Sequence, residues 1–193
     1  MKLRYYILGT ITIVLAYRGC QPSYTNIPNT SDLDFSKKGT TYETEFIVPV
    51  NIFGSWIDFA IATYPQRGHD EEAGRVSYRM KQGLDKNYQP ISPEKNQYYK
   101  FKITLTPLGW ASKKIKYGTY SKKLNINTKD KIEEIVTIPL YGKAYTNGPL
   151  KYIMSAELQQ YRSYHVKIES LQDVQLPKYF KTSFDIEEGS GKH

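Results

Sequence analysis

The side chains that could do chemistry are few, and their spacing matches no catalytic pattern. His69 is followed directly by Asp70, Glu71 and Glu72. Imidazole and carboxylate groups are the ligand types for zinc and for harder cations. Adjacent side chains on an extended chain point in opposite directions, and no second His or Cys cluster is available to complete a ligand shell. We therefore expect a solvated acidic segment here and no metal site.

Hydrolytic chemistry has equally little support. Ser55 lies in a Gly-Ser-Trp stretch that lacks the second glycine of a nucleophile elbow. Asp58, Glu133 and Glu134 could form the carboxylate pair of a glycoside hydrolase only if the fold brought them together. No Gly-rich phosphate loop is present. The sequence predicts a protein that is not an enzyme and has no cofactor, with an envelope hydrolase as the enzymatic alternative.

The N-terminus has the features of an export signal. Lys2 and Arg4 precede a run of about a dozen mostly apolar residues, from Tyr5 to Ala16. This run is shorter than the roughly 20 residues that span a bilayer. We predict a signal peptide over residues 1–19, which takes no part in the fold.

The single cysteine, Cys20, lies directly after this segment and follows Gly19. The arrangement resembles the lipobox of bacterial lipoproteins, which implies that the thiol is lipidated and becomes the first mature residue. Tyr17 and Arg18 depart from the lipobox pattern, so an exported soluble protein with an unmodified cysteine is the alternative. The resemblance implies a membrane attachment through the lipid. Gln21, which is not an aspartate, favours the outer membrane, with the protein facing the periplasm.

The charge pattern argues against nucleic acid as a partner. The chain has a formal net charge of +8, and removing the three basic residues among the first nineteen leaves +5. Its lysines are scattered or paired, and no run of five or six basic residues occurs. The simplest interpretation is a set of solvated strand faces. The functional alternative is a basic surface that steers an acidic partner or an anionic envelope polymer.

The mature chain is patterned almost entirely as strands. Residues 20–42 lack periodicity and are rich in Ser, Thr, Asn, Pro and Gly, which predicts a lipidated tether. Apolar and polar residues then alternate in a series of short runs, as in half-buried strands. The predicted strands lie at 43–50, 55–64, 98–107, 114–118, 123–127, 134–141, 150–158, 163–169 and 180–187.

These runs predict one all-β domain. We expect an immunoglobulin-like antiparallel β-sandwich of about seven to nine strands over residues 43–188, with a closed barrel as the alternative. Residues 69–84 have an acidic start and a basic end and could form a short helix or a polar loop. Pro49 and Pro139 each remove a ladder donor, so their strands should lie at edges or bulges. Residues 189–193 should form a disordered tail.

The order of these segments resembles a group of small bacterial β-sandwich lipoproteins of unknown function. The likeness covers residues 42–188 and rests on FIVPV, on SWIDFAIATYP, on YKFKITLTPLG and on the closing segment YHVKIESLQDVQLPKYFKTSFDIEE. It implies the sandwich fold and supplies no catalytic residues. Some exported lipoproteins of this general style are encoded beside secreted antibacterial effectors and act as immunity proteins.

The remaining functional candidates are aromatic and basic side chains. The chain contains 18 tyrosines, and tyrosine is enriched at binding surfaces. Two loop-rich stretches predict a protein- or glycan-binding edge that includes Tyr141, Tyr145, Tyr161, Arg162 and His165. The alternative is that these tyrosines only pad an aromatic-rich sandwich.

The leading hypothesis is a non-enzymatic periplasmic lipoprotein that binds a protein partner. In its most concrete form it is an immunity protein, whose loops and basic strand faces occlude a secreted effector. A structural or accessory envelope component, in contact with the cell wall or a secretion apparatus, is the alternative.

Overall fold

The computed structural model describes most of the chain after the predicted tether. The described residues are 33–48, 56–66, 68, 70–111, 115–120, 122–127, 131–142 and 150–189. The predicted signal peptide, Cys20, His69 and Tyr145 lie outside this part of the chain. Of the predicted C-terminal tail, only Gly189 is described.

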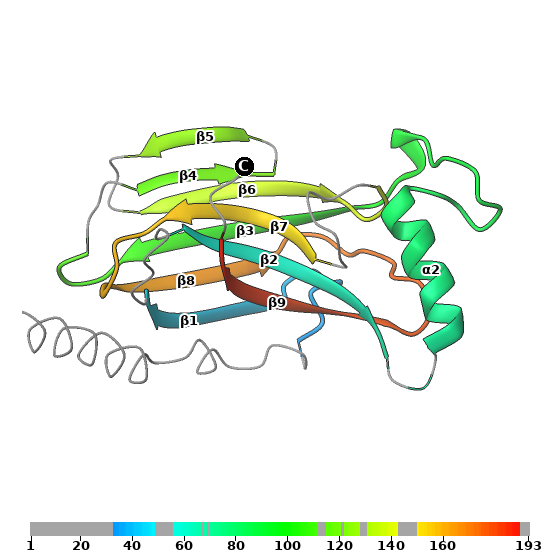
Figure 1. Cartoon of the computed structure of the whole chain (residues 1–193), viewed down its shortest axis with the longest axis horizontal. Helices are drawn as coiled ribbons and strands as arrows, with labels where there is room; N and C mark the ends of the chain where they lie inside the picture. The colour runs from blue at the N-terminus through cyan, green and yellow to red at the C-terminus, as the bar shows by residue number, and fades with distance from the viewer. Residues whose placement is uncertain are drawn as a thin grey trace, which may run out of the picture.

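Within the described residues, nine strands form two antiparallel sheets that pack face to face (Figure 1). The four-stranded sheet has the order β1 (Thr41–Ile47), β8 (Ser163–Ser170), β3 (Tyr98–Pro107) and β6 (Ile132–Pro139). The five-stranded sheet has the order β5 (Lys122–Asn127), β4 (Ile115–Thr119), β7 (Leu150–Glu157), β2 (Trp56–Pro65) and β9 (Phe180–Glu188). The predicted antiparallel β-sandwich, with its number of strands, is confirmed.

The order of the strands is nested. β1 pairs with β8, β2 with β7, β3 with β6 and β4 with β5. The first eight strands therefore pair like the two arms of one long hairpin that has been rolled up, which is the strand order of a jelly roll. This order differs from the immunoglobulin-like order of the prediction. β9 is an addition to this arrangement and extends the five-stranded sheet beside β2.

The core lies between the sheets and follows from alternation along each strand. In β3, Tyr99, Phe101, Ile103 and Leu105 are completely buried, whereas Lys100 on the other face is exposed. Because each such apolar side chain gains about 1.5–3 kcal/mol on burial, this alternation determines which face of the strand turns inward.

Aromatic rings join the two sheets across the core. The ring of Phe59 in β2 lies 6.0 Å from that of Phe46 in β1, which belongs to the other sheet, and 6.4 Å from that of Phe184 in β9 of its own sheet. Such ring pairs add about 0.5–1.5 kcal/mol each beyond the area they bury.

The fold begins earlier than predicted, so the boundary placed at residues 42–43 is too late. Phe35 is completely buried, and its ring lies 6.4 Å from that of Phe101 and 6.3 Å from that of Phe184. The N–H of Gly39 also donates to the carbonyl of Ser170 at 2.8 Å. Residues 33–42 therefore belong to the sandwich, because the Phe35 side chain packs into the core although the residues around it are mostly polar.

The segment predicted as a helix or a polar loop is a helix, α2 (Asp70–Gln82). It ends in a Schellman motif. The N–H of Gly83 donates to the carbonyl of Met80, and the N–H of Leu84 donates to the carbonyl of Arg79. Gly83 has a φ of +70°, which glycine adopts without steric cost. A 3₁₀ turn, η2 (Pro93–Lys95), lies in the connection that leads from α2 to β3.

The prediction for Pro139 is confirmed, because β6 is an edge strand and Pro139 is its last residue. No helix among the described residues is long and apolar enough to cross a membrane.

Candidate binding surface

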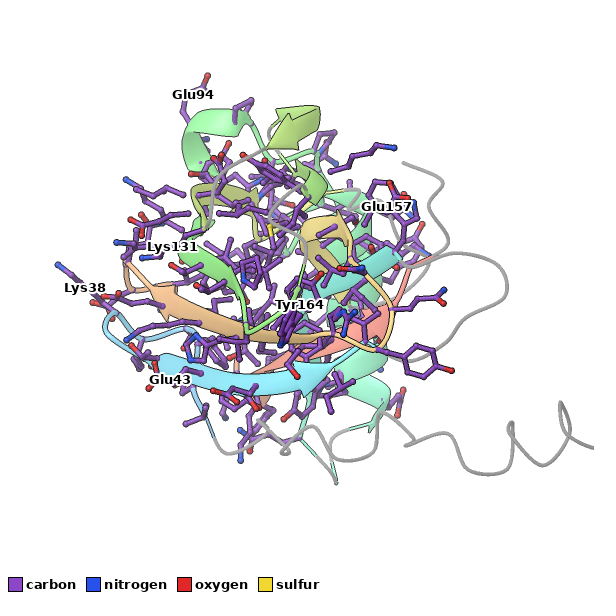
Figure 2. The ribbon with its side chains drawn as sticks, turned by 90° about the vertical axis from the view of Figure 1, so that its left-hand side faces the viewer. Lys38, Glu43, Glu94, Lys131, Glu157 and Tyr164 are labelled. Carbon is purple, nitrogen blue, oxygen red and sulfur yellow. The ribbon has the colours of Figure 1, made fainter. Side chains whose placement is uncertain are left out.

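The sandwich has two ends that differ in character. At the tip end, β1, β3 and β7 finish while β6 and β8 begin; this end is on the left of Figure 1 and faces the viewer in Figure 2. At the helix end, α2 packs beside the sheets on the right of Figure 1. Tyr164, labelled in Figure 2, lies between the sheets at the tip end and is completely buried.

The tip end displays an exposed tryptophan. Trp110 lies in a turn directly after β3, in which the N–H of Ala111 donates to the carbonyl of Leu108 at 3.0 Å. Gly109, next to it, has a φ of +54°. The Trp110 side chain is 90% exposed. An exposed indole offers a partner a large, rigid apolar surface and a polar N–H.

A strained tyrosine lies beside this turn. Tyr161 has a φ of 57°, which costs a residue with a side chain about 1–2 kcal/mol. Its N–H donates to the carbonyl of Val48 at 2.7 Å, and the N–H of Val48 donates to the carbonyl of Arg162 at 3.0 Å. Tyr161 and Arg162 thus lie opposite the single residue Val48, as in a β-bulge. The left-handed position of such a bulge normally holds glycine. The result is a tyrosine held 53% exposed on a fixed backbone.

Ile47 and Arg162 complete this surface. Ile47 is 57% exposed and pairs with Ser163, whose carbonyl also accepts a hydrogen bond from the N–H of Leu108 at 2.9 Å. Neighbouring strands lie about 4.8 Å apart, so Ile47 and Leu108 are about 10 Å from each other. Arg162 is exposed and forms no ion pair with any described residue. We call Ile47, Trp110, Tyr161 and Arg162 the tip patch.

The predicted binding residues do not all meet. Tyr161 and Arg162 lie in the tip patch, and His165 follows in β8, between Glu45 of β1 and Thr106 of β3. Tyr141 comes just after β6 at the helix end, since Pro139 pairs with Tyr98 at the start of β3. β3 spans ten residues, or about 30 Å, between the two ends. Tyr145 lies outside the described residues.

The outer face of the four-stranded sheet is balanced in charge. Lys102 and Lys131 both pair with Glu133, at 2.8 and 2.9 Å, and Lys167 pairs with Glu43 at 3.4 Å. Hydrogen bonds from the two lysines lower the pKa of Glu133 to about 2. Lysines that are already paired offer little to an acidic partner. Occlusion by basic strand faces, as hypothesised from the sequence, therefore finds no support on this sheet.

The carboxylates considered for hydrolysis lie apart. Asp58 is in β2 of the five-stranded sheet, whereas Glu133 and Glu134 are in β6, an edge of the other sheet. Glu134 accepts a hydrogen bond from the hydroxyl of Tyr117 at 2.7 Å. In the described ranges, no group of three or more His, Cys, Asp or Glu residues could hold a metal ion.

Sequence reasoning missed Trp110 and Ile47. Trp110 is not among the predicted binding residues, and Ile47 is only one position of the strand predicted at 43–50. The available signal was the Leu-Gly-Trp order: a tryptophan next to a turn glycine has no partner strand to pack on. The pairing of Ile47 with Ser163, by contrast, depends on the strand order.

Comparison with known proteins adds no assignment: no family model, no curated protein and no solved structure matches this chain. The resemblance to small sandwich lipoproteins stays a prediction.

Proposed function

We propose that this protein is a non-enzymatic, exported lipoprotein that binds a protein partner through the tip patch. The observation that carries the proposal is the composition of this patch. Trp, Tyr and Arg are the residue types that supply most of the energy in protein interfaces. The backbone segments of Trp110, Tyr161 and Arg162 meet at this end of the sandwich, where Ile47 is also exposed.

The position of the patch suits a tethered protein. The described chain enters at Leu33 and starts β1 at Thr41, at the helix end, and β1 then runs toward the tip end and finishes at Ile47. This strand of seven residues spans about 20 Å. A lipid before residue 33 would join the chain at the end of β1 opposite the tip patch, so the attachment would leave the tip patch free to meet a partner.

The charge of the patch indicates the chemistry of the partner. Arg162 has no acidic partner among the described residues, and the chain as a whole is basic. The partner should present a carboxylate next to an apolar socket for the indole of Trp110. An effector protein with an acidic rim around its active site fits this description, with this chain acting as its immunity protein.

Site-specific photocrosslinking in intact cells tests the proposal. A photoreactive residue at position 110 of the full chain should give one dominant adduct with an envelope or secreted protein. The same residue at position 135 is the control, because Ile135 is 54% exposed but lies on β6 away from the patch.

The purified partner then allows the decisive comparison. Trp110→Ala should weaken binding at least tenfold, whereas Ile135→Ala should leave it unchanged. Equal losses in both variants, or adducts at 135 and none at 110, would refute the tip patch as the interface. An adduct with a cell-wall or secretion-apparatus component would keep the patch but favour the structural envelope function.

A further inference from the structure

At the helix end, Arg79 has no hydrogen-bonding partner among the described residues. Arg79 lies in the last turn of α2 and is half-buried. Its Nε is buried and unpaired, and its guanidinium forms no hydrogen bond or ion pair with the described residues. A guanidinium has five N–H donors, and each donor that is removed from water without a partner is costly.

The other arginine of the same helix does have a partner. Arg75, one turn earlier, pairs with Glu71 at 2.6 Å. Near Arg79 the carboxylate is that of Asp85, but its Oδ1 accepts hydrogen bonds from the N–H groups of Asn87 and Gln89, at 2.8 and 2.9 Å. Asp85 is thus engaged in its own turn and interacts with Arg79 only through space.

An aromatic ring holds the guanidinium in place. The Cζ atom of Arg79 lies 5.7 Å from the centre of the Tyr88 ring, within the range of a cation–π contact. Tyr88 has a φ of 60° and is fixed by the hydrogen bond from its N–H to the carbonyl of Asp85, at 3.1 Å. The backbone strain therefore positions this ring over Arg79.

A second tyrosine approaches from β6. The N–H of Gly142 donates to the carbonyl of Met80 at 2.7 Å, which brings the Tyr141 backbone beside Arg79. The side chain of Asn96 donates to the carbonyl of Tyr141 at 2.8 Å and accepts from its N–H at 3.2 Å. Burial raises the pKa of Tyr141, so its hydroxyl keeps its proton at neutral pH.

We propose that Arg79, Tyr88 and Tyr141 form a binding site for an oxyanion group, a carboxylate or a phosphate, at the end of the sandwich opposite the tip patch. The guanidinium presents a planar fork that matches such a group with two parallel hydrogen bonds. Partial burial strengthens this attraction, because fewer water molecules compete for the donors. The site is independent of the proposed partner binding and goes beyond it.

The position of Arg79 near the helix C-terminus offers a simpler explanation, since a cation there interacts favourably with the helix dipole. That explanation accounts for a basic residue in the last turn. It does not account for the unpaired Nε or for the strained backbone of Tyr88.

Titration of the full chain, followed by amide NMR, tests the site with two separate probes, inorganic phosphate and acetate. We expect saturable shifts at residues 79, 88 and 141 with at least one probe. Saturation by phosphate alone identifies a phosphate group as the ligand chemistry, and saturation by acetate alone identifies a carboxylate.

Two variants separate the site from effects on folding. Arg79→Gln should weaken binding of the anion at least tenfold, whereas Arg75→Gln, on the same helix, should leave the affinity for the anion unchanged. Tyr88→Gly removes the ring and also relieves the strain of the left-handed backbone. It should therefore weaken binding of the anion while the protein remains at least as stable as the natural chain. No saturable shift with either anion, or equal affinity in Arg79→Gln and the natural chain, would overturn the proposal.

Discussion

The backbones of Val48 and Tyr161 are hydrogen-bonded to each other, and this contact fixes the turn that presents Tyr161 in the tip patch. The N–H of Tyr161 donates to the carbonyl of Val48 at 2.7 Å while Tyr161 stays in the left-handed region. Below them the hydroxyl of the buried Tyr164 accepts a hydrogen bond from the N–H of Gln159 at 2.9 Å. The turn is therefore rigid before any partner arrives, which lowers the entropy cost of binding.

The strain at Tyr161 predicts opposite effects on stability and on binding. Asparagine tolerates the left-handed region better than tyrosine, so Tyr161→Asn should raise the free energy of unfolding by up to about 1 kcal/mol. It should also reduce partner binding, because the ring is lost. Chemical denaturation and the affinity for the crosslinked partner measure the two effects. Tyr161→Phe is the control and should preserve both. A loss of stability in Tyr161→Asn would show that the ring supports the fold.

Two glycines of the α2 region should respond in opposite directions to the same substitution. Gly74 lies inside the helix, and a Cβ added there meets nothing within 4 Å. Gly74→Ala should therefore stabilise the protein by about 0.5–1 kcal/mol. Gly83 has a φ of +70°, and an added Cβ would lie 3.3 Å from the Cα of Gly142. Gly83→Ala should destabilise the protein by at least 1 kcal/mol. Thermal unfolding of both variants checks the pair; equal shifts would contradict the helix end as described.

Lys151 should make stability depend on pH in the alkaline range. Its side chain is 6% exposed, and its Nζ donates to the carbonyl of Pro139 at 2.6 Å. Burial lowers the pKa of Lys151 from 10.5 to about 8. The unfolded chain therefore holds this proton more tightly than the folded chain does. The charged form penalises folding fully below pH 8, and the penalty disappears as the pH rises toward 10.5.

Lys151→Met measures this penalty. Methionine fills similar space without a charge, so the variant should be more stable at pH 7 by about 1–3 kcal/mol, after allowance for the lost hydrogen bond. Its advantage over the natural chain should shrink between pH 8 and pH 10.5. Denaturant unfolding at pH 7 and pH 10 compares the two. A constant difference between them at both pH values would show that Lys151 does not titrate in this window.

Asn96 should contribute to stability through the backbone of Tyr141. Its amide satisfies both the N–H and the carbonyl of that residue. Asn96→Ala leaves both groups without this partner and should cost about 2 kcal/mol. Asn96→Asp keeps an acceptor for the N–H but sets a carboxylate oxygen against the Tyr141 carbonyl, so its loss should be at least as large as that of Asn96→Ala. Denaturant unfolding ranks the two variants, and a smaller loss in Asn96→Asp would show that the hydrogen bond to the carbonyl contributes little.

Local pattern was enough to predict each strand of the described residues, and it left a short helix or a polar loop open for residues 69–84. The alternation predicted for β3 is present in the structure. Every second residue from Tyr99 to Leu105 is completely buried. The helix over 70–82 could be placed from its charge distribution, although Gly74 had left a loop open as the alternative. Pro139 indicated an edge or a bulge because a missing N–H is tolerated at such positions, and the structure places it at an edge.

The binding surface could be predicted only in part. Tyr161 and Arg162 are adjacent in sequence, and their exposure follows from a loop. Trp110 and Ile47 join them through the pairing of β1 and β3 with β8, at sequence separations that no local pattern reports. The same pairing separates Tyr141 from the others, at the far end of β3.

The sequence by itself determined which residues face inward, because burial of apolar side chains acts on each strand through its own alternation. Tertiary structure alone decided which strands are neighbours, and therefore that Ile47, Trp110 and Tyr161 share one end while Arg79, Tyr88 and Tyr141 share the other. The physical reason is that antiparallel pairing depends on register and packing between distant segments, and many strand orders would bury the same alternating residues equally well.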